Sequence, residues 1–420
     1  MFARYDRMLI RNLLLMSAIG FIAHIILAIV ISPFPQSDAL DYHEHALRLA
    51  NTFSYTLNEI PTAYRPIGFP AVLSIVYAIS PSMIAGFVLQ SLLMSISGLL
   101  IALILKEYKA SDRCSYLGLI IYLLLPTTWV QSMTFMSEPL AIMSMLIGVY
   151  LRIIQKSAQS RFMEGAFWGI AILTRPIMIF SVLGIILFDL LKGSSKKLNI
   201  MFISGCALIL FPWMARNAIV MGSPMIASNT GINLLIGHNP EANGSYKFAE
   251  DMHRFDALSE IEANASALKS AVHNIANDPF HSIALIPKKI AFLFASDAYL
   301  PLQIMHVEGD SYREKIHNLP WWSALLIIPG ALLIFFGISH GKVLFTLPER
   351  TFLATIIFGM IIPCAIFFGT ARYHEPMIPF FVIAFMLGMD RHGKILGGIF
   401  ALSFALLMLW LIEYAMIFLL

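Results

Sequence analysis

The feature that most constrains this chain is its series of apolar runs, most of them long enough to cross a lipid bilayer as a helix. Crossing the hydrocarbon core takes roughly 20 mainly apolar residues. The runs lie at residues 8–32, 83–105, 115–133, 138–155, 162–174, 176–191, 198–216, 319–338, 350–370, 375–390 and 395–418. They predict an all-α polytopic membrane protein with about 11 transmembrane helices.

Composition excludes the main soluble classes. Of the 420 residues, 58% are apolar and 13% are charged, whereas soluble domains are roughly half apolar and a quarter charged. The net charge of +3 is too small to indicate an acidic partner, so we expect no nucleic acid. Three cysteines (Cys114, Cys206 and Cys364) give no disulfide framework. The first apolar run is too long for a cleaved signal peptide and is expected to be a signal anchor.

The distribution of basic residues sets the expected orientation. One further apolar stretch, 67–80, is too short to span the membrane and is placed on its outer face. With a cytoplasmic N-terminus, 16 of the 28 basic residues then fall in inside segments and four in short outside segments, as the positive-inside rule requires. If this stretch spanned the membrane, every later loop would flip and the bias would reverse.

The same topology divides the chain into three parts. An N-terminal transmembrane module (1–216) carries a first outer loop at 33–82, an outer segment follows at 217–318, and further transmembrane helices occupy 319–420. Within the outer segment an apolar stripe at helical spacing predicts an amphipathic helix over 251–276. The stripe consists of Leu258, Ile261, Ala265, Leu268, Val272 and Ile275, and Asn277-Asp278-Pro279 ends the helix.

Ionisable residues gather at the expected outer face. A helix beginning at Ser37 or Asp38 would place Asp38, Asp41, Tyr42 and His45 on one side, either as a catalytic surface or as a solvated helix face with a capping aspartate. An ionised carboxylate at a membrane edge can accept a proton from a hydroxyl group. Ionisable groups near the apolar layer are costly and point to function.

Five further motifs fall at the same face. They are Tyr64-Arg65-Pro66, Ser137-Glu138-Pro139, Thr174-Arg175-Pro176, Arg372-Tyr373-His374-Glu375-Pro376, and Pro212-Trp213 through Arg216-Asn217 with the loop 229–240 that contains Asn233. Arginine binds phosphate in a fork geometry. The arrangement suits a lipid-borne phosphate, although Arg65 could also contact lipid headgroups and Glu138 could simply complement a helix dipole.

Together these pieces resemble the GT-C class of integral-membrane glycosyltransferases, in the branch of protein O-mannosyltransferases and aminoarabinose-lipid A transferases. The pieces are the helix at 37–50, Tyr64-Arg-Pro-x-Gly-Phe-Pro70, Ser137-Glu-Pro139, Leu173-Thr-Arg-Pro176, Pro212-Trp-x-x-Arg-Asn217, Gly231-x-Asn-Leu-x-x-Gly237 and Arg372-Tyr-x-x-Pro376. The resemblance implies a GT-C-like fold with interfacial helices in the first outer loop. It also implies transfer of one sugar, with inversion, from a polyprenyl-phosphate donor to an acceptor hydroxyl.

The resemblance assigns roles to individual residues. Asp38 is the general base, and Asp41 shares or takes that role because Ala39 stands where the family has glutamate. Glu138 is the second acid, and Arg372 holds the donor phosphate with Arg65 and Arg175. The further substrate-binding candidates are Tyr42, Arg216, Asn233, Tyr373 and His374. No cofactor is certain, and a divalent cation on Asp38 and Glu138 is left open.

Two alternatives to a transferase remain at this point. A flippase or transporter of a lipid-linked sugar would need polar groups through the membrane midplane, and the spans look almost free of them. A membrane scaffold would leave the acidic cluster unexplained. For the transferase we expect a bacterial inner membrane, membrane lipids around the bundle, a site on the periplasmic side, and a lipid, glycan or protein as acceptor.

Overall fold

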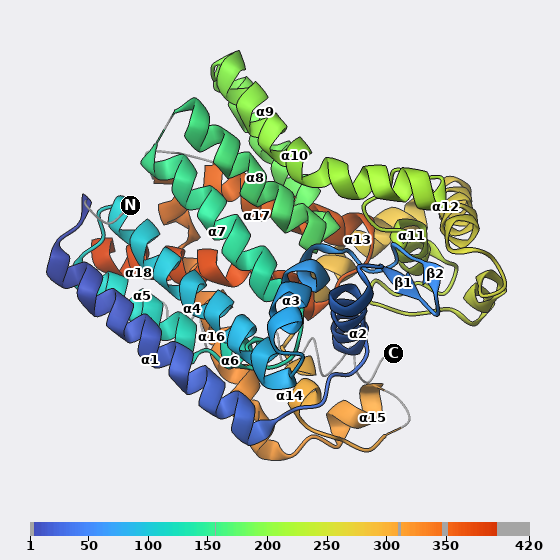
Figure 1. Cartoon of the computed structure of the whole chain (residues 1–420), viewed down its shortest axis with the longest axis horizontal. Helices are drawn as coiled ribbons and strands as arrows, with labels where there is room; N and C mark the ends of the chain where they lie inside the picture. Colours follow the sequence, from blue (N-terminus) through green and yellow to red (C-terminus); the bar gives the residue numbers. More distant parts are fainter. Residues whose placement is uncertain (1–3, 156, 310–311, 347–351, 393–420) are drawn as a thin grey trace.

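The computed structural model describes residues 4–155, 157–309, 312–346 and 352–392, which form a bundle of helices with one small hairpin (Figure 1). The helices are α1 (Arg7–Ile31), α2 (Asp38–Thr52), α3 (Gly68–Ile79), α4 (Met83–Glu107), α5 (Asp112–Leu124), α6 (Pro126–Gln131), α7 (Glu138–Ile154), α8 (Ala158–Thr174), α9 (Ile179–Leu191), α10 (Lys196–Met221), α11 (Thr230–His238), α12 (Glu260–Asn277), α13 (Pro279–Leu293), α14 (Tyr299–Ile304), α15 (Tyr312–His317), α16 (Ala324–Ser339), α17 (Phe352–Ile366) and α18 (Ile378–His392). Strands β1 (Thr56–Leu57) and β2 (Ile60–Pro61) pair antiparallel, and short 3₁₀ segments include Pro176–Met178, Glu250–Phe255, Trp321–Ser323 and Ala371–Met377. The predicted all-α architecture is confirmed apart from this two-stranded hairpin.

Four helical stretches in the described residues are long and apolar enough to cross a membrane: α1, α4, α10 and Trp321–Ser339. In the most apolar 18-residue stretch of α4, 78% of the residues are buried inside the protein, against 17% in the corresponding stretch of α1. The helix α4 is therefore the centre of the bundle, and α1 lies at its edge with apolar side chains facing outward. The expected number of 11 spans stays a prediction: further apolar helices, such as Gly68–Ile79 and Phe352–Ile366, are shorter, and the run at 395–418 lies outside the described residues.

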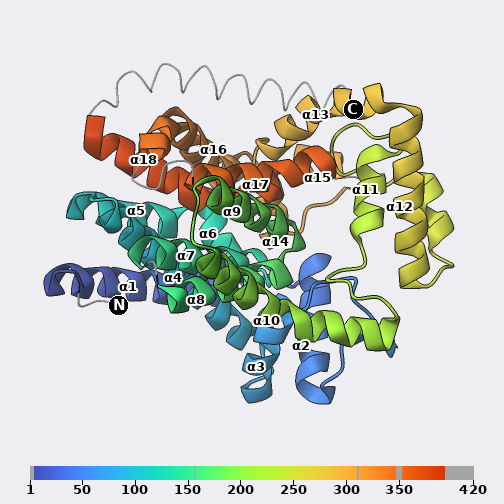
Figure 2. The ribbon, with the colours of Figure 1, turned by 90° about the horizontal axis from the view of Figure 1, so that it is seen from above.

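The two predicted outer regions gather at one end of the bundle. In both views the helices α2 and α3 and the helices α11 and α12 lie at the end away from the N-terminus (Figures 1 and 2). The helix α3 packs against α2 and α4 rather than continuing the bundle. This end carries the charged residues discussed below.

The helices α8 and α10 approach each other through glycine. A Cβ atom on Gly165 would lie 1.9 Å from the carbonyl oxygen of Phe202, and one on Gly205 would lie 2.0 Å from the carbonyl oxygen of Phe162. Gly165 and Gly169 are four residues apart on α8, the spacing that lets membrane helices pack backbone to backbone. The close contact holds the end of α8, and with it Arg175, in place.

Several predicted elements are wrong in detail. The run 115–133 is two helices, because Leu125 takes an extended conformation (ψ 132°) before Pro126, as residues preceding proline do. The run 375–390 begins as a 3₁₀ segment, Ala371–Met377, and becomes the helix α18 only at Ile378. The loop predicted at 229–240 is mostly the helix α11.

The predicted amphipathic helix is also corrected. It starts at Glu260, where Ser259 and Glu262 form a capping box, and not at 251. Its buried residues are Ala267 and Ala271, whereas Leu268 is 41% and Val272 is 55% exposed. The small side chains face α11 because Gly231 brings the two backbones together: a Cβ there would lie 2.0 Å from the carbonyl oxygen of Asn264.

A group of four buried charges joins α7, α8 and α9, and corrects the expectation that the spans hold almost no polar groups. Arg152 and Arg161 bind Glu164 and Asp189, and all four side chains are at most 8% exposed. Arg161 Nη1 lies 2.5 Å from Glu164 Oε2, and Arg152 Nη1 lies 3.1 Å from Asp189 Oδ2. Arg152 is 14 residues along α7 from Glu138, about 21 Å at the rise of an α-helix. We call this group the inner quartet.

Candidate functional site

Six charged side chains from separate parts of the sequence meet at the end of the bundle that carries α2 and α3. They are Asp38 and Asp41 on α2, Arg65 in the turn before α3, Glu138 in the first turn of α7, Arg175 after α8, and Arg372 in the 3₁₀ segment before α18. We call them the charge cluster. All six were predicted as site residues.

Acids and guanidinium groups alternate through the charge cluster. Arg65 Nη2 lies 2.7 Å from Asp38 Oδ1 and 2.7 Å from Asp41 Oδ2. Arg372 Nη1 donates to Asp38 Oδ2 at 2.6 Å, and its Nε binds Glu138. Arg175 binds the same oxygen of Glu138. Three carboxylates are therefore matched by three guanidinium groups, and Arg372 joins the two halves.

Exposure falls from one end of the charge cluster to the other. The side chain of Asp41 is 41% exposed, that of Asp38 is 26% exposed, and that of Glu138 is fully buried. A molecule arriving from solvent can therefore reach Asp41 and Asp38 but not Glu138. Glu138 is suited instead to hold Arg175 and Arg372 in place.

Electrostatics keep Asp38 ionised. Burial acts to raise the pKa of Asp38, but the guanidinium groups of Arg372 and Arg65 outweigh it and hold the pKa below its usual value. An opposite charge within a few ångströms favours the charged form in this way. Asp38 can thus accept a proton at neutral pH, although its basicity is reduced while both arginines contact it.

Aromatic side chains line the charge cluster. Tyr42 is 5% exposed and packs edge-on against Phe69 at 5.8 Å. Tyr373 stacks on Phe368 at 5.6 Å, and the guanidinium carbon of Arg175 lies 5.6 Å from the centre of the Tyr373 ring. These rings limit water around the ion pairs, which strengthens them.

Three predicted site residues lie elsewhere. Arg216 donates to the backbone oxygens of Thr62 and Tyr55 at 3.0 and 2.7 Å. Asn233 lies on α11 and takes no part in the ion pairs of the charge cluster. His374 is fully buried, with its Nε2 2.9 Å from Asp297 Oδ1 and its Nδ1 2.6 Å from the backbone oxygen of Leu293.

A buried polar network next to the charge cluster was missed from the sequence. Burial acts to lower the pKa of His374, but the carboxylate of Asp297 raises it overall. Glu375, the next residue, binds Tyr299 and accepts from Gln131 Nε2 at 2.9 Å. Glu375 belongs to the same motif as Arg372 and could have been included. Asp297 and Tyr299 stand in no motif that would have singled them out.

The donor set of the charge cluster does not fit a divalent cation. Within the described part of the chain, no three histidine, cysteine, aspartate or glutamate side chains are grouped so that they could hold a metal ion. The two acids considered for a cation, Asp38 and Glu138, are each neutralised by two arginines. They bind guanidinium groups rather than converging on a shared point.

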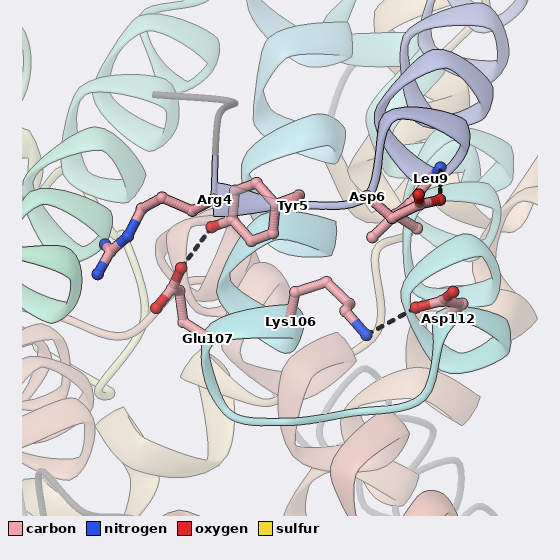
Figure 3. A pocket seen from close by; sticks show the side chains of 7 residues that line it. All are labelled: Arg4, Tyr5, Asp6, Leu9, Lys106, Glu107 and Asp112. Carbon is pink, nitrogen blue, oxygen red and sulfur yellow. Dashed lines mark hydrogen bonds and ion pairs between the residues drawn. The ribbon is translucent and has the colours of Figure 1, made fainter.

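A cavity of about 420 Å³ lies at the other end of the bundle, where α1 begins and α4 ends (Figure 3). Two pairs of its polar lining residues contact each other: Tyr5 donates to Glu107 at 2.5 Å, and Lys106 Nζ lies 2.6 Å from Asp112 Oδ1. It shares no residue with the charge cluster and is separated from it by the length of α4.

No protein-family model and no curated protein sequence matches the chain. Solved structures that resemble it in fold include the following three. An oligosaccharyltransferase from Archaeoglobus fulgidus, tethered to an acceptor peptide, has 13% identity and a TM-score of 0.48 over 92% of this chain. ArnT from Cupriavidus metallidurans bound to undecaprenyl phosphate has 12% identity and a TM-score of 0.45 over 90% of this chain, and AglB from A. fulgidus with an inhibitory peptide and dolichol phosphate has 10% identity and a TM-score of 0.45 over 88%.

These structural neighbours are glycosyltransferases of the GT-C fold, the class that the sequence resembles. The chain spans about half the length of the oligosaccharyltransferase (53%) and 77% of ArnT. With identities of 13% or less and TM-scores below 0.5, the likeness carries no argument about substrate or activity. The function is therefore argued from the charge cluster itself.

Proposed function

We propose that this chain transfers a single sugar from a polyprenyl-phosphate donor to an acceptor hydroxyl at the outer face of a membrane. The observation that carries the proposal is the charge cluster: a partly exposed carboxylate, Asp38, lies between two arginines beside a bundle of apolar helices. A lipid phosphate and an acceptor hydroxyl are the two groups that this combination can bind and activate together. The resemblance described from the sequence implies the same reaction.

The proposed reaction is one displacement at the anomeric carbon. Asp38 takes the proton of the acceptor hydroxyl, and the acceptor oxygen forms a bond to that carbon from the face opposite the phosphate. The bond between the carbon and the phosphate oxygen breaks, so configuration inverts and polyprenyl phosphate leaves with the electron pair. Arg372 and Arg175 stabilise the negative charge that develops on the phosphate.

In this proposal, binding of the donor phosphate also changes the basicity of Asp38. A phosphate that binds Arg372 competes with Asp38 for the same N–H groups, because Arg372 Nη1 donates to Asp38 Oδ2 at 2.6 Å. Asp38 is then left with Arg65 alone and becomes a stronger base. Donor binding would in this way prepare Asp38 for the acceptor.

Labelled polyprenyl-phosphate sugar tests the proposal. The purified protein should release free polyprenyl phosphate in step with glycosylation of an acceptor, and replacing Asp38 should stop both. Movement of intact labelled lipid across a vesicle membrane, without release, would instead support the flippase. If the protein binds the lipid but neither releases polyprenyl phosphate nor moves the lipid across the membrane, both the transferase and the flippase proposals are contradicted, and the scaffold is the remaining alternative.

The position in the cell is part of the same proposal. We place the charge cluster on the periplasmic side of a bacterial inner membrane, with 33–82 and 217–318 outside and the module 1–216 and the helices of 319–420 in the bilayer. The donor is then a polyprenyl-phosphate sugar of the outer leaflet. The acceptor is a lipid, glycan or protein that reaches Asp38 from the periplasm.

A further inference from the structure

We infer that Glu260, the first residue of α12, is a positioning residue that holds Arg65 in the charge cluster through the segment 55–65. We call the contacts of Glu260 with this segment the clamp. The clamp is argued from geometry alone, whereas its effect on catalysis rests on the proposed function. Glu260 lies in the outer segment, nearly 200 positions after Arg65 in the sequence. Neither the sequence motifs nor the charge cluster includes it.

Glu260 binds three donors, two of them in the segment that precedes Arg65. Its carboxylate accepts from the Thr62 hydroxyl at 2.6 Å and from the Ala63 backbone N–H at 2.8 Å. The hydroxyl of Ser228 binds the same carboxylate, and the backbone N–H of Ser228 donates to the Ala63 oxygen at 3.0 Å. A carboxylate can accept several hydrogen bonds at once, so Glu260 holds the N–H side of Ala63 while Ser228, itself bound to Glu260, holds its carbonyl side.

A cation on α10, Arg216, holds the same segment. Arg216 donates to the backbone oxygens of Thr62 and Tyr55, and its guanidinium carbon lies 5.0 Å from the centre of the Trp213 ring. Glu260 therefore accepts from the N–H of Ala63, and Arg216 donates to the backbone oxygen of Thr62 in the same peptide group. Arg216 thus contacts the backbone of the segment 55–65, and its role in substrate binding stays a prediction.

Tyr55 carries the clamp to Arg65 itself. The Tyr55 hydroxyl donates to the backbone oxygen of Arg65 at 3.0 Å. Its ring stacks on His45 at 4.6 Å and packs edge-on against Trp213 at 5.2 Å. The backbone of Arg65 is thus held directly by Tyr55 and through Thr62 and Ala63 just before it, which restricts the guanidinium group that contacts Asp38 and Asp41.

The physical reason for such a clamp is the cost of ordering a long side chain. An arginine side chain has many rotamers and loses more conformational entropy than most side chains when it is fixed, and Arg65 lies in a partly exposed turn. A braced backbone leaves only the side chain to be ordered by Asp38 and Asp41. The outer segment would in this way set the position of a residue in the charge cluster without touching substrate.

The first test reads the position of Arg65 without any reaction. An arginine-selective dicarbonyl reagent is applied to the purified full-length protein, and the modification rate of Arg65 is measured by peptide mass spectrometry. In Glu260→Ala we expect Arg65 to react roughly fivefold faster or more, as the loss of buried hydrogen bonds predicts. Glu260→Gln, which can still accept from Ala63 and can donate to the Thr62 hydroxyl, should remain near the unmodified protein.

The matched control is Glu241→Ala, which removes an exposed carboxylate of the outer segment that contacts only Lys247 among the recorded ion pairs. It should leave the rate at Arg65 unchanged. Equal rates at Arg65 in Glu260→Ala and in Glu241→Ala would overturn the clamp. This result is independent of whether the protein transfers sugar.

The second test asks whether Glu260 acts through Arg65 in catalysis. In a double-mutant cycle, Glu260→Ala should lower kcat/KM for the polyprenyl-phosphate sugar by roughly 10-fold or more in the native background, but by less than about threefold in Arg65→Ala, since coupled residues are not additive. The same factor in both backgrounds would show a general structural effect and reject the positioning role. If the native protein transfers no sugar, the proposed function fails while the modification test still decides the clamp.

Discussion

Asp38 is the residue on which the proposed chemistry depends, because it alone among the three acids is both partly exposed and in contact with two arginines. We expect Asp38→Asn to lower the transfer rate by a factor of about 10² to 10⁴, the usual contribution of a general base. Asp41→Asn is the matched control, since Asp41 binds only Arg65 among the ion pairs of the charge cluster. Initial rates of polyprenyl phosphate release measure both. Near-normal rates in Asp38→Asn, with a large loss in Asp41→Asn, would move the base to Asp41.

The pH dependence of the rate follows from the same contacts. Because Arg372 and Arg65 hold the pKa of Asp38 below its usual value, the acid limb of kcat/KM should lie below about pH 4, where unperturbed aspartate titrates. The groups that face Asp38 are these two arginines and the like charge of Glu138. A carboxyl whose pKa is lowered on folding adds stability above its unfolded pKa, and this stability is lost as the pH falls through the folded value.

Removing Arg372 should shift the acid limb of the pH profile of kcat/KM to higher pH. In Arg372→Gln the loss of a positive charge favours the protonated form of Asp38, so the acid limb should move to higher pH by roughly one unit or more. We also expect a lower maximal rate, but the pH at which the acid limb lies is measured independently of that rate. Arg254→Gln, which changes an exposed arginine of the outer segment, should leave the profile in place. An unshifted limb in Arg372→Gln would refute the link between this arginine and the base.

At the scale of elements, the inner quartet ties together α7, α8 and α9 and thereby sets the frame on which Glu138 and Arg175 are held. Removing one member of a buried ion pair costs about 3–5 kcal/mol, and without Asp189 the guanidinium groups of Arg152 and Arg161 share the single carboxylate of Glu164 within the inner quartet. Asp189→Ala should therefore lower the thermal stability of the protein in detergent strongly, because Arg152 and Arg161 both bind Asp189.

The control for the inner quartet is Asp112→Ala. Its partner Lys106 lies 2.6 Å away, but the Asp112 side chain is 56% exposed, and an exposed pair contributes only about 0–1 kcal/mol. We expect a small change in the melting temperature for this variant. Comparable losses in Asp112→Ala and Asp189→Ala would show that the inner quartet adds nothing beyond an ordinary surface pair.

The sequence predicted helices well where the periodicity and the length of an apolar run agree. It failed where contacts with another helix determine which face is buried or where a helix begins. The end of the amphipathic helix at Asn277 was predicted, but its buried face was not, because Gly231 on another helix admits only small side chains such as Ala267. The break at Pro126 lies inside a run that is apolar enough over its whole length to be taken as one span, so the break had to be inferred from the proline rather than from hydropathy. Local propensity is a weak guide wherever tertiary contacts override it.

For the whole molecule, the positive-inside rule was the step that placed distant motifs at one end. The structure brings Asp38 within 2.6 Å of Arg372, 334 positions later in the sequence. No motif predicted the polar network of Asp297 and Tyr299 or the clamp of Glu260, because a single acid at a helix start is usually a dipole contact. Such long-range pairs depend on how the outer segment packs on the bundle, and helical periodicity within that segment does not show its partners.

Membrane orientation is the prediction on which the proposed site stands as a whole, and thiol labelling can decide it. The three native cysteines are buried, so single cysteines introduced at exposed positions give a clean signal. Ile60→Cys and Glu241→Cys should react with a membrane-impermeant maleimide in right-side-out vesicles, because the hairpin and the outer segment lie on the side of the charge cluster. Arg113→Cys and Lys192→Cys lie in the basic loops and should react only after the membrane is opened. If positions 60 and 113 reacted from the same side, the bundle would not separate the two ends of α4, and an outer-face acceptor could not reach Asp38.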